Sequence, residues 1–519
     1  MAKPKQHYAL IAAKWMTASS YVTFVTGAIN SIIITHALGP RLYGVYAYLV
    51  WMITFAVSVI TGGVNLTAIR VISSTIGKDT QNPSTESLAV FAFLRKILHK
   101  VLTVAALLLL ASTLIPRLYP HDLAAHLLVY ILFVLLCAAA KALYMFTVSA
   151  SKGFMVFETE AISNMLVGTI TPALGAGLLL THQGLPAFMG LFGGAILAQL
   201  AVSQWMLRKR GLKALSSRPT EETCQKIAQL FRWNTFLSLT TQLTPKSIDT
   251  YLLGYLSLTI AVGQYNLAAN LSRAGVDVLI AGFSAILLPY LSRVQAENGM
   301  SELREAFTTA TCLYQGFGFL IAGAGYFLAD FLILFLYGPR FTEAIPAFQV
   351  MAIMGGITLP FGAYSAVLIA TDNMRLRLSY ILGTALISLL CSLLIVPRYG
   401  YYGALLSICV AGTLSLVYTI VLCYVTIRLA FPFRHILAQW FCALGPLLIL
   451  RQLFPHRQTA LAAITPTIAY GCAFLLLSVN LGGWRRSDLL RFGRQSPAAA
   501  WLLRQIALVG RAEISQSSK

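Results

Sequence analysis

The stretch HALGPRLYGVYAYLVWM, residues 36–52, breaks an apolar run of sequence and then resumes it. Five residues that interrupt an apolar helix fall within it: His36, Gly39, Pro40, Arg41 and Gly44. Glycine and proline are the residues that most often end and turn a helix. The stretch therefore predicts a tight turn between two apolar helices, 15–37 and 43–66. We interpret Arg41 as an interfacial anchor in that turn.

The composition outside this stretch is that of a membrane protein. Apolar residues fill 58% of the 519 positions and charged residues only 11%, with a mean hydropathy of +0.75. A soluble domain carries about 25% charged residues. Apolar runs near or above the length of a membrane-spanning helix recur along the whole chain. The sequence thus predicts an all-α polytopic membrane protein rather than several soluble domains.

We predict about fourteen transmembrane helices from these runs. Their ranges are 15–37, 43–66, 96–116, 122–148, 161–181, 186–207, 233–255, 262–290, 308–336, 346–370, 378–396, 402–427, 436–454 and 459–481. Of the 38 Lys and Arg residues, 29 lie on the face shared with the termini and 6 on the opposite face. By the positive-inside rule both termini are cytoplasmic. The net charge of +21 is therefore a signal of topology, and it does not indicate nucleic-acid binding.

The longest polar connection, 208–232, divides the chain into two six-helix halves. LGPRLYGVYAYL (38–49) and LGYLSLTIAVGQYNLAANL (253–271) share Leu-Gly, a short turn and Gly-x-Tyr, which favours a parallel repeat. The same likeness also fits two unrelated turns, since glycine is common in turns. The expected domains are an N-terminal lobe (1–214), a basic cytoplasmic linker (215–232), a C-terminal lobe (233–430), an additional helix pair (431–484) and a basic cytoplasmic tail (485–519).

The tail, 485–519, has an amphipathic pattern. Its apolar residues Trp501, Leu502, Leu503, Ile506 and Val509 fit one helical face, and arginines flank them. This pattern favours a helix that lies on anionic cytoplasmic lipid. A basic tail with only partial order fits the same composition.

Ionisable residues inside membrane spans are costly, so each one indicates a role. Lys246 and Asp249 lie three positions apart in one predicted span, and Arg273 and Asp277 four apart in the next. Lys141 lies inside the fourth span. We predict a central cavity in which a set of cationic and amide side chains binds an anionic head group: Lys141, Lys246, Arg273, Asn30 and Asn270. Asp249 and Asp277 would balance these charges or carry a coupling ion.

A structural role for the same charges is the alternative. Lys246 with Asp249, and Arg273 with Asp277, would then be local pairs that neutralise each other and tie helices together. Lys141 would extend its ammonium group to the cytoplasmic head groups. The first span favours the cavity, because TASSYVTFVTGAINSIIIT (17–35) is too polar for a helix that faces only lipid.

Signatures of enzymes and cofactor sites are absent from the sequence. There is no glycine-rich phosphate loop, no HExxH and no GxSxG motif. The 8 cysteines are scattered without a CxxC pair. A membrane glycosyltransferase or ligase would need a large external loop with catalytic residues, and the predicted external loops are short. We therefore expect a transporter without a cofactor, with a proton or a sodium ion as the coupling ion.

Four stretches resemble one known family. ITHALGPRLYGVYAYLVWM (34–52) is similar to the signature after the first helix of bacterial polysaccharide transporters, the Wzx-type flippases of the multidrug/oligosaccharidyl-lipid/polysaccharide exporter superfamily. Residues 252–273, 336–353 and 393–417 look similar to later passages of that family. The resemblance extends to about residue 430. It implies two pseudo-symmetric six-helix lobes around a central cavity, with two additional C-terminal helices.

The activity implied by the resemblance is the movement of polyprenyl-pyrophosphate-linked oligosaccharide repeat units across the bacterial inner membrane by alternating access. The units would supply O-antigen, capsule or exopolysaccharide synthesis. Undecaprenyl-pyrophosphate-linked oligosaccharide and membrane lipids are then the expected partners, together with a polysaccharide polymerase and a chain-length regulator.

Two other activities occur in the same superfamily. Lipid II flippases usually carry arginines in the first helix, and segment 15–37 has none. Multidrug and metabolite exporters, which are cation-coupled, usually have twelve helices. Both remain alternatives to the oligosaccharide flippase.

Overall fold

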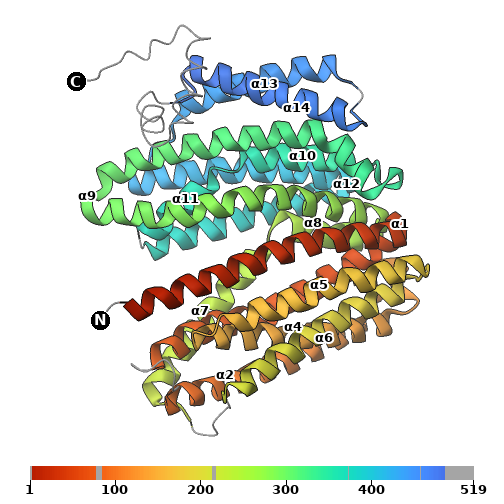
Figure 1. Ribbon diagram of the computed structural model, residues 1–519, viewed down its shortest axis with the longest axis vertical. Coiled ribbons are helices and arrows are strands. Elements are labelled where there is room, and N and C mark those ends of the chain that lie inside the picture. The colour runs from red at the N-terminus through yellow and green to blue at the C-terminus, as the bar shows by residue number, and fades with distance from the viewer. Residues whose placement is uncertain (1–2, 77–83, 213–217, 372, 456, 485–519) are drawn as a thin grey trace. The chain divides into compact units, whose positions relative to one another are not determined.

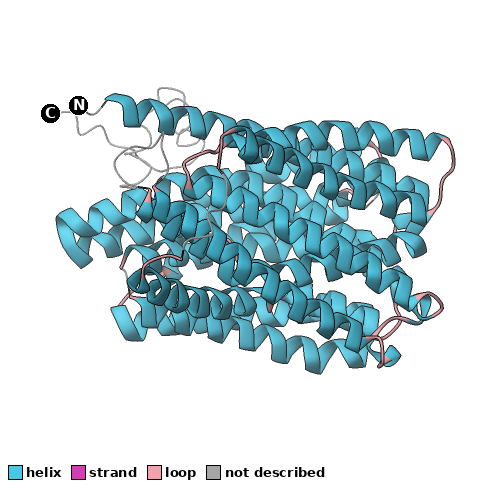
Figure 2. Ribbon diagram, turned by 90° about the horizontal axis from the view of Figure 1, so that it is seen from below, coloured by secondary structure: helices cyan, strands magenta, loops and turns pink. Residues whose placement is uncertain are grey.

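The computed structural model describes residues 3–76, 84–212, 218–371, 373–455 and 457–484. Within these ranges it leaves out the side chains at 3–14, 16–17, 274, 276–286, 289, 298 and 374. The described residues form helices, turns and loops, with no strand among them (Figures 1 and 2). The expected all-α class is confirmed.

The chain divides into two compact units, residues 1–263 and 264–519. Unit 1 contains α1 (Lys3–Thr75), α2 (Thr85–Ser112), η1 (Pro116–Leu118), α3 (His121–Ala124), α4 (Leu127–Gly153), α5 (Glu158–Leu180), α6 (Leu185–Lys209), α7 (Glu221–Gln242) and α8 (Pro245–Tyr255). Helix α9 (Thr259–Tyr337) begins in unit 1 and continues in unit 2. Unit 2 also contains η2 (Pro339–Phe341), α10 (Ala344–Ile357), α11 (Phe361–Ala370), α12 (Met374–Ile427), α13 (Phe433–Leu453) and α14 (Ala460–Asn480).

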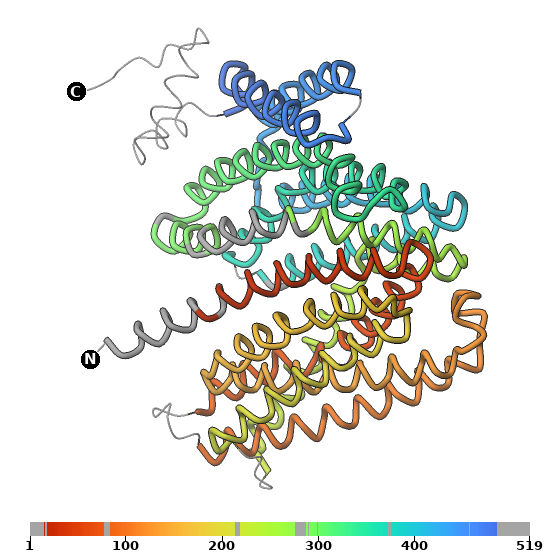
Figure 3. Tube along the Cα trace, turned by 45° about the vertical axis from the view of Figure 1, so that its right-hand side comes forward, coloured from red at the N-terminus to blue at the C-terminus, as the bar shows by residue number. Residues whose placement is uncertain are grey.

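The three longest helices each consist of two arms that meet at a glycine (Figure 3). The glycines have positive φ angles of 66° at Gly39, 77° at Gly299 and 57° at Gly400. Glycine adopts this left-handed backbone without the steric cost that a Cβ brings. The turn expected over residues 38–42 is thus confined to Gly39. Because Pro40 has the φ angle of a first helical residue, the second arm starts there.

Three predicted helices are each divided in two. The range 122–148 is divided between α3 and α4 by a turn at Ala125 and His126. The range 233–255 is divided between α7 and α8, because Pro245 begins a new helix and the Thr244 side chain accepts a hydrogen bond from the Ser247 amide. The range 346–370 is divided between α10 and α11, which are bent by 40°. Helix α7 already begins at Glu221, so the second half of the predicted linker 215–232 is helical.

The apolar helices are long enough for a membrane protein. Eight helices in the described ranges, or nine if the pair α10 and α11 counts as one span, are long and apolar enough to cross a bilayer. Two of them, in α1 and α12, exceed 50 residues and contain a glycine turn. The chain is therefore a multi-pass membrane protein, and the count of fourteen spans stays a prediction.

The two turns that look alike in the sequence pack together in unit 1. A Cβ on Gly44 would lie 1.9 Å from the carbonyl oxygen of Thr259, and a Cβ on Gly263 would lie 2.8 Å from that of Pro40. Each Gly-x-Tyr motif thus supplies the glycine that lets the other turn approach. Along the second arm of α1, Tyr48 occupies the space where Gly254 has no side chain. These contacts attach α8 and the start of α9 to α1.

The additional helix pair is bound to the second arm of α9 within unit 2. The ring of Tyr470 packs on Gly323, and its hydroxyl donates to the carbonyl oxygen of Phe319 at 3.1 Å. Arg457, only 8% exposed, is paired with Asp330 at 3.1 Å and lies over the rings of Tyr326 and Phe327. The pair α13 and α14 is therefore an integral part of unit 2.

The boundary between the units lies at Gly263, beyond the predicted lobe boundary at 214–232. It lies there because α7 and α8 pack along α1: Asn234 donates to Thr67 at 3.1 Å, and Trp51 donates to Ser247 at 3.0 Å. A division of the chain by compactness does not test a division into transport lobes. The predicted lobes therefore stay a prediction.

Candidate functional site

Helices α1 and α5 of unit 1 lie against each other through small residues. A Cβ on Gly168 would lie 3.2 Å from Thr26 Oγ1, and one on Gly175 would lie 3.7 Å from Asn30 Oδ1. Asn30 is half-buried at this contact. The polar face of the first arm of α1 is thus turned toward α5, not toward lipid alone.

A cavity of about 330 Å³ lies beside this contact, near the start of α5. Its lining residues are Ser19, Ser20, Thr23, Phe24, Glu160 and Asn164. The described lining residues include hydroxyl, amide and carboxylate groups and one aromatic ring, but no lysine or arginine. The volume lies in the range of ligand pockets, about 300–1,000 Å³. We treat this cavity and the side chains that support it as the candidate site.

Asn164 is the centre of a polar network behind the cavity. Its Oδ1 atom accepts a hydrogen bond from the Tyr144 hydroxyl at 2.8 Å and another from Gln199 Nε2 at 3.3 Å. Gln199 Oε1 in turn accepts from Lys141 Nζ at 2.8 Å. The ammonium group of Lys141 also lies 4.7 Å from the centre of the Tyr144 ring. Lys141 is therefore held by its neighbours on α4 and α6.

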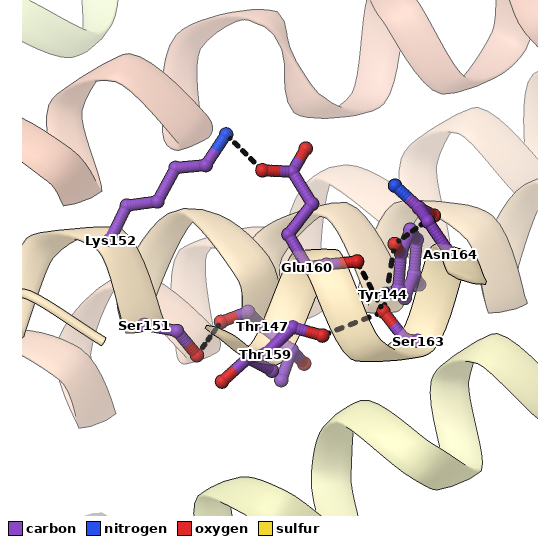
Figure 4. Close-up of polar contacts among 8 residues, drawn as sticks. All are labelled: Tyr144, Thr147, Ser151, Lys152, Thr159, Glu160, Ser163 and Asn164. Carbon is purple, nitrogen blue, oxygen red and sulfur yellow. Dashed lines mark hydrogen bonds and ion pairs between the residues drawn. The ribbon is translucent and has the colours of Figure 1, made fainter. Parts of the chain in front are cut away.

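Glu160 forms an ion pair at the same end of the site. Its Oε2 atom lies 2.6 Å from Lys152 Nζ, and about a quarter of each side chain is exposed. Figure 4 shows Lys152 and Glu160 facing each other, and Ser163 and Asn164 further along α5 with Tyr144 of α4 beside them. The Ser163 hydroxyl donates to the carbonyl oxygen of Thr159 at 2.7 Å, which keeps it inside its own helix. A carboxylate with its counter-ion thus flanks the cavity.

The other predicted residues of unit 1 lie on α8. Lys246 is half-buried in its first turn, and Asp249 is completely buried. Both therefore lie inside the protein, as a role in binding or charge balance requires. Their assignment to substrate or to ion coupling remains a prediction.

The remaining predicted residues lie on α9 in unit 2. Asn270 and Arg273 are both exposed on the surface of that unit. Asp277 falls in the same helix, and its side chain lies outside the described residues. The structure thus describes a polar site inside unit 1, and the cavity between two lobes stays a prediction.

The sequence does not identify Glu160, Asn164 or Gln199 as ligand contacts or supports, and it does not identify Tyr144 or Lys152 either. Glu160 falls in the predicted cytoplasmic loop before the fifth span, where a charged residue is common and does not indicate a site. Asn164 is visible only as a polar residue at a helix end. Gln199 lies within an apolar glycine-rich helix. The spacing Glu160-x-x-x-Asn164 puts two polar groups on one helix face, and this is the signal that was available.

A metal site is not part of this arrangement. No group of three or more His, Cys, Asp or Glu side chains in the described ranges could hold a metal ion.

The end of unit 1 that holds the Gly39 turn has a second polar network. Arg41 Nη2 lies 2.7 Å from Asp122 Oδ1, and the Thr259 hydroxyl also donates to Asp122. The hydrogen bond from Arg41, followed by that from Thr259, lowers the pKa of the Asp122 carboxyl. Arg41 is therefore a partner of Asp122, and not only the interfacial anchor that the sequence suggested. The network connects the turn of α1, α3 and the start of α9.

Comparisons with known proteins give one family and one fold. A sequence model of the family described as "Polysaccharide biosynthesis protein" matches residues 12–295. Among solved structures, the lipid II flippase MurJ in an inward closed conformation is similar over 89% of this chain and 97% of its own, with a TM-score of 0.64 and 14% identity.

Two MATE structures are also similar. An inward-facing multidrug resistance MATE family transporter of the MOP superfamily is similar over 80% of this chain and 98% of its own, with a TM-score of 0.60 and 13% identity. A mutant of the Vibrio cholerae MATE transporter VcmN is similar over 81% and 98%, with a TM-score of 0.51 and 14% identity. No curated protein matches the chain. At these identities the structural likeness shows the fold.

Proposed function

Because the chain belongs to the polysaccharide biosynthesis protein family of the multidrug/oligosaccharidyl-lipid/polysaccharide exporter superfamily, we propose that it is a flippase for polyprenyl-pyrophosphate-linked oligosaccharides. It would move repeat units from the cytoplasmic to the outer leaflet of the bacterial inner membrane for O-antigen, capsule or exopolysaccharide synthesis. Both termini would be cytoplasmic. A polysaccharide polymerase would use the units outside, with a chain-length regulator.

The observation that supports this proposal most strongly is the cavity lined by Ser19, Ser20, Thr23, Phe24, Glu160 and Asn164. Helices that face only lipid do not concentrate hydroxyl, amide and carboxylate groups around one volume, since each polar group costs free energy there. A hydrophilic head group that crosses the bilayer needs such a volume. The polyprenyl chain does not, because lipid solvates it.

The predicted anion-binding residues complete the proposal. Lys246 and Arg273 would contact the pyrophosphate or acidic sugars during transport, together with Asn30 and Asn270. Asp249 and Asp277 would balance their charge or carry the coupling proton or sodium ion. The half-buried position of Lys246 and the full burial of Asp249 support a role inside the protein for both.

Deletion of the gene in its source strain tests the proposal. We expect surface polysaccharide to be lost and the lipid-linked repeat unit to accumulate on the cytoplasmic leaflet, with both effects reversed by the intact gene. Unchanged polymer with a new sensitivity to amphipathic compounds would instead indicate the multidrug exporter. Arrest of peptidoglycan synthesis with normal surface polymer would indicate a lipid II flippase.

A further inference from the structure

The donor and acceptor roles in the network behind the unit 1 cavity follow from the charge of Lys141. Lys141 Nζ can only donate, so Gln199 must present its carbonyl oxygen Oε1 to it. The Gln199 amide nitrogen then faces Asn164 and donates to Oδ1. The Tyr144 hydroxyl donates to the same oxygen atom. The charge of Lys141 thus fixes the orientation of both amide side chains.

The consequence for Asn164 is that its donors are directed to the cavity. Its Oδ1 atom accepts two hydrogen bonds and has no lone pair left for a ligand. Asn164 lines the cavity, so the group it can offer there is its NH₂. Glu160, one helical turn earlier, lines the same cavity and offers carboxylate oxygen as an acceptor. A donor and an acceptor therefore lie next to each other on one face of α5.

This pair indicates the chemistry of the ligand. A sugar hydroxyl both donates and accepts, so two adjacent hydroxyls of one ring satisfy Asn164 and Glu160 together. Ser19, Ser20 and Thr23 add hydroxyl partners, and Phe24 adds an aromatic face for the C–H side of the ring. A pyrophosphate can only accept hydrogen bonds, and the Glu160 carboxylate, which is paired with Lys152, offers it no donor.

We propose that the unit 1 cavity is a sugar subsite, in which Asn164 and Glu160 bind hydroxyl groups of one ring of the oligosaccharide. Lys141 is a positioning residue for this subsite and does not contact phosphate. The inference rests on the proposed function, because it assigns one part of that substrate to one part of the protein. It gives Lys141 a different role from the anion-binding role predicted from the sequence, and it leaves the pyrophosphate to other residues.

Binding of two lipids by the full-length protein in nanodiscs separates the sugar from the phosphate. The probes are undecaprenyl pyrophosphate that carries one N-acetylglucosamine and the same lipid without sugar. The wild type should bind the sugar-bearing lipid more tightly. Asn164→Leu and Lys141→Met should each weaken that binding about tenfold, the loss expected for one hydrogen bond to the ligand, with no change for the bare lipid.

Matched variants control for general effects of the substitutions. Asn480→Leu makes the same exchange at an exposed position on α14, and Lys209→Met at the exposed end of α6. Both should bind the two lipids as the wild type does. Lys141→Arg keeps a donor and a charge, so it should recover most of the preference for the sugar-bearing lipid.

Three results would overturn the inference. Equal binding of the two lipids by the wild type would mean that the cavity takes no sugar, although a flippase function would stand. Weaker binding of the bare lipid by Lys141→Met would mean that Lys141 binds phosphate, and the flippase function would again stand. If the wild type bound neither lipid, the proposed function itself would fail.

Discussion

The ammonium group of Lys141 lies 2.8 Å from the amide oxygen of Gln199, so the cation sits one hydrogen bond behind the cavity wall. A lysine inside a membrane span indicates substrate contact when only the sequence is known. In the fold, the ammonium group of Lys141 contacts Gln199 and the ring of Tyr144 instead. The charge then acts through the orientation of Asn164, and the cavity remains suited to uncharged hydroxyl groups.

The pairing of Lys152 and Glu160 should contribute to both stability and transport. The atoms lie 2.6 Å apart with about a quarter of each side chain exposed. A double-mutant cycle with Lys152→Met and Glu160→Gln should give a coupling energy of about 1 kcal/mol from thermal or chemical unfolding. Additive effects of the two substitutions would show that the pair contributes nothing to stability. Transport should fall in every variant that lacks Glu160, because the neutral amide oxygen of Gln is a weaker hydrogen-bond acceptor than the carboxylate.

The contact between Gly44 and Thr259 should tolerate no side chain. A Cβ on Gly44 would lie 1.9 Å from the Thr259 carbonyl oxygen, and backbone must move to make room. Gly44→Ala should therefore destabilise the protein by about 1–3 kcal/mol, measured as a loss of thermal stability in detergent.

Gly194→Ala is the matched control for Gly44→Ala. A Cβ at Gly194 in α6 would meet no atom within 4 Å. Replacement of a helical glycine by alanine then stabilises the helix by about 0.5–1 kcal/mol. If both alanine variants had the melting temperature of the wild type, the close contact between Gly44 and Thr259 would be contradicted.

The network of Arg41, Asp122 and Thr259 should make stability depend on pH in the acidic range. The pKa of Asp122 is lowered in the folded protein by Arg41 and Thr259. A lowered carboxyl pKa gives stability that is complete above the unfolded value, about 3.9, and is lost as the pH falls through the folded value. The melting temperature of Asp122→Asn should therefore be below that of the wild type at pH 7. The two should converge as the pH falls below the folded pKa of Asp122, and a gap that persists there would exclude ionisation as the cause.

Arg273, which is exposed on α9, should be needed for transport and not for folding. Arg273→Ala should reduce surface polysaccharide at least about tenfold with an unchanged protein level, since a charged contact with the substrate is removed. Arg293→Ala is the control, because Arg293 lies on the same helix in an exposed pair with Glu297. Full polymer production by Arg273→Ala would remove Arg273 from the anion-binding set.

Substitution of Asp277 tests whether this residue carries the coupling ion. Asp277→Asn should reduce transport and abolish its dependence on the proton or sodium gradient, because a neutral amide cannot exchange a cation. Glu297→Gln, at the exposed pair on the same helix, should leave that dependence unchanged. An unaltered dependence in Asp277→Asn would leave Asp277 as a counter-ion only.

The sequence predicts the fold class well and the site only in part, for physical reasons. Apolar runs and the glycines at 39 and 400 determine where helices form and turn, because these are local effects. Pro245 is a local signal of the same kind and predicts the break at Leu243–Thr244. The bend between α10 and α11 depends on packing and was missed. The partners of Lys141 and Arg41 come from helices far apart in the chain, so no local pattern identifies Gln199 or Asp122.

Translocation by the purified full-length protein tests the central claim most directly. Proteoliposomes would contain undecaprenyl pyrophosphate linked to the repeat oligosaccharide extracted from the source strain, and an external lectin would report the sugar that reaches the outer leaflet. We expect lectin-accessible sugar to increase with time for the wild type and to increase about tenfold more slowly for Asn164→Leu. Equal accessibility with the wild-type protein and with protein-free liposomes would contradict the account.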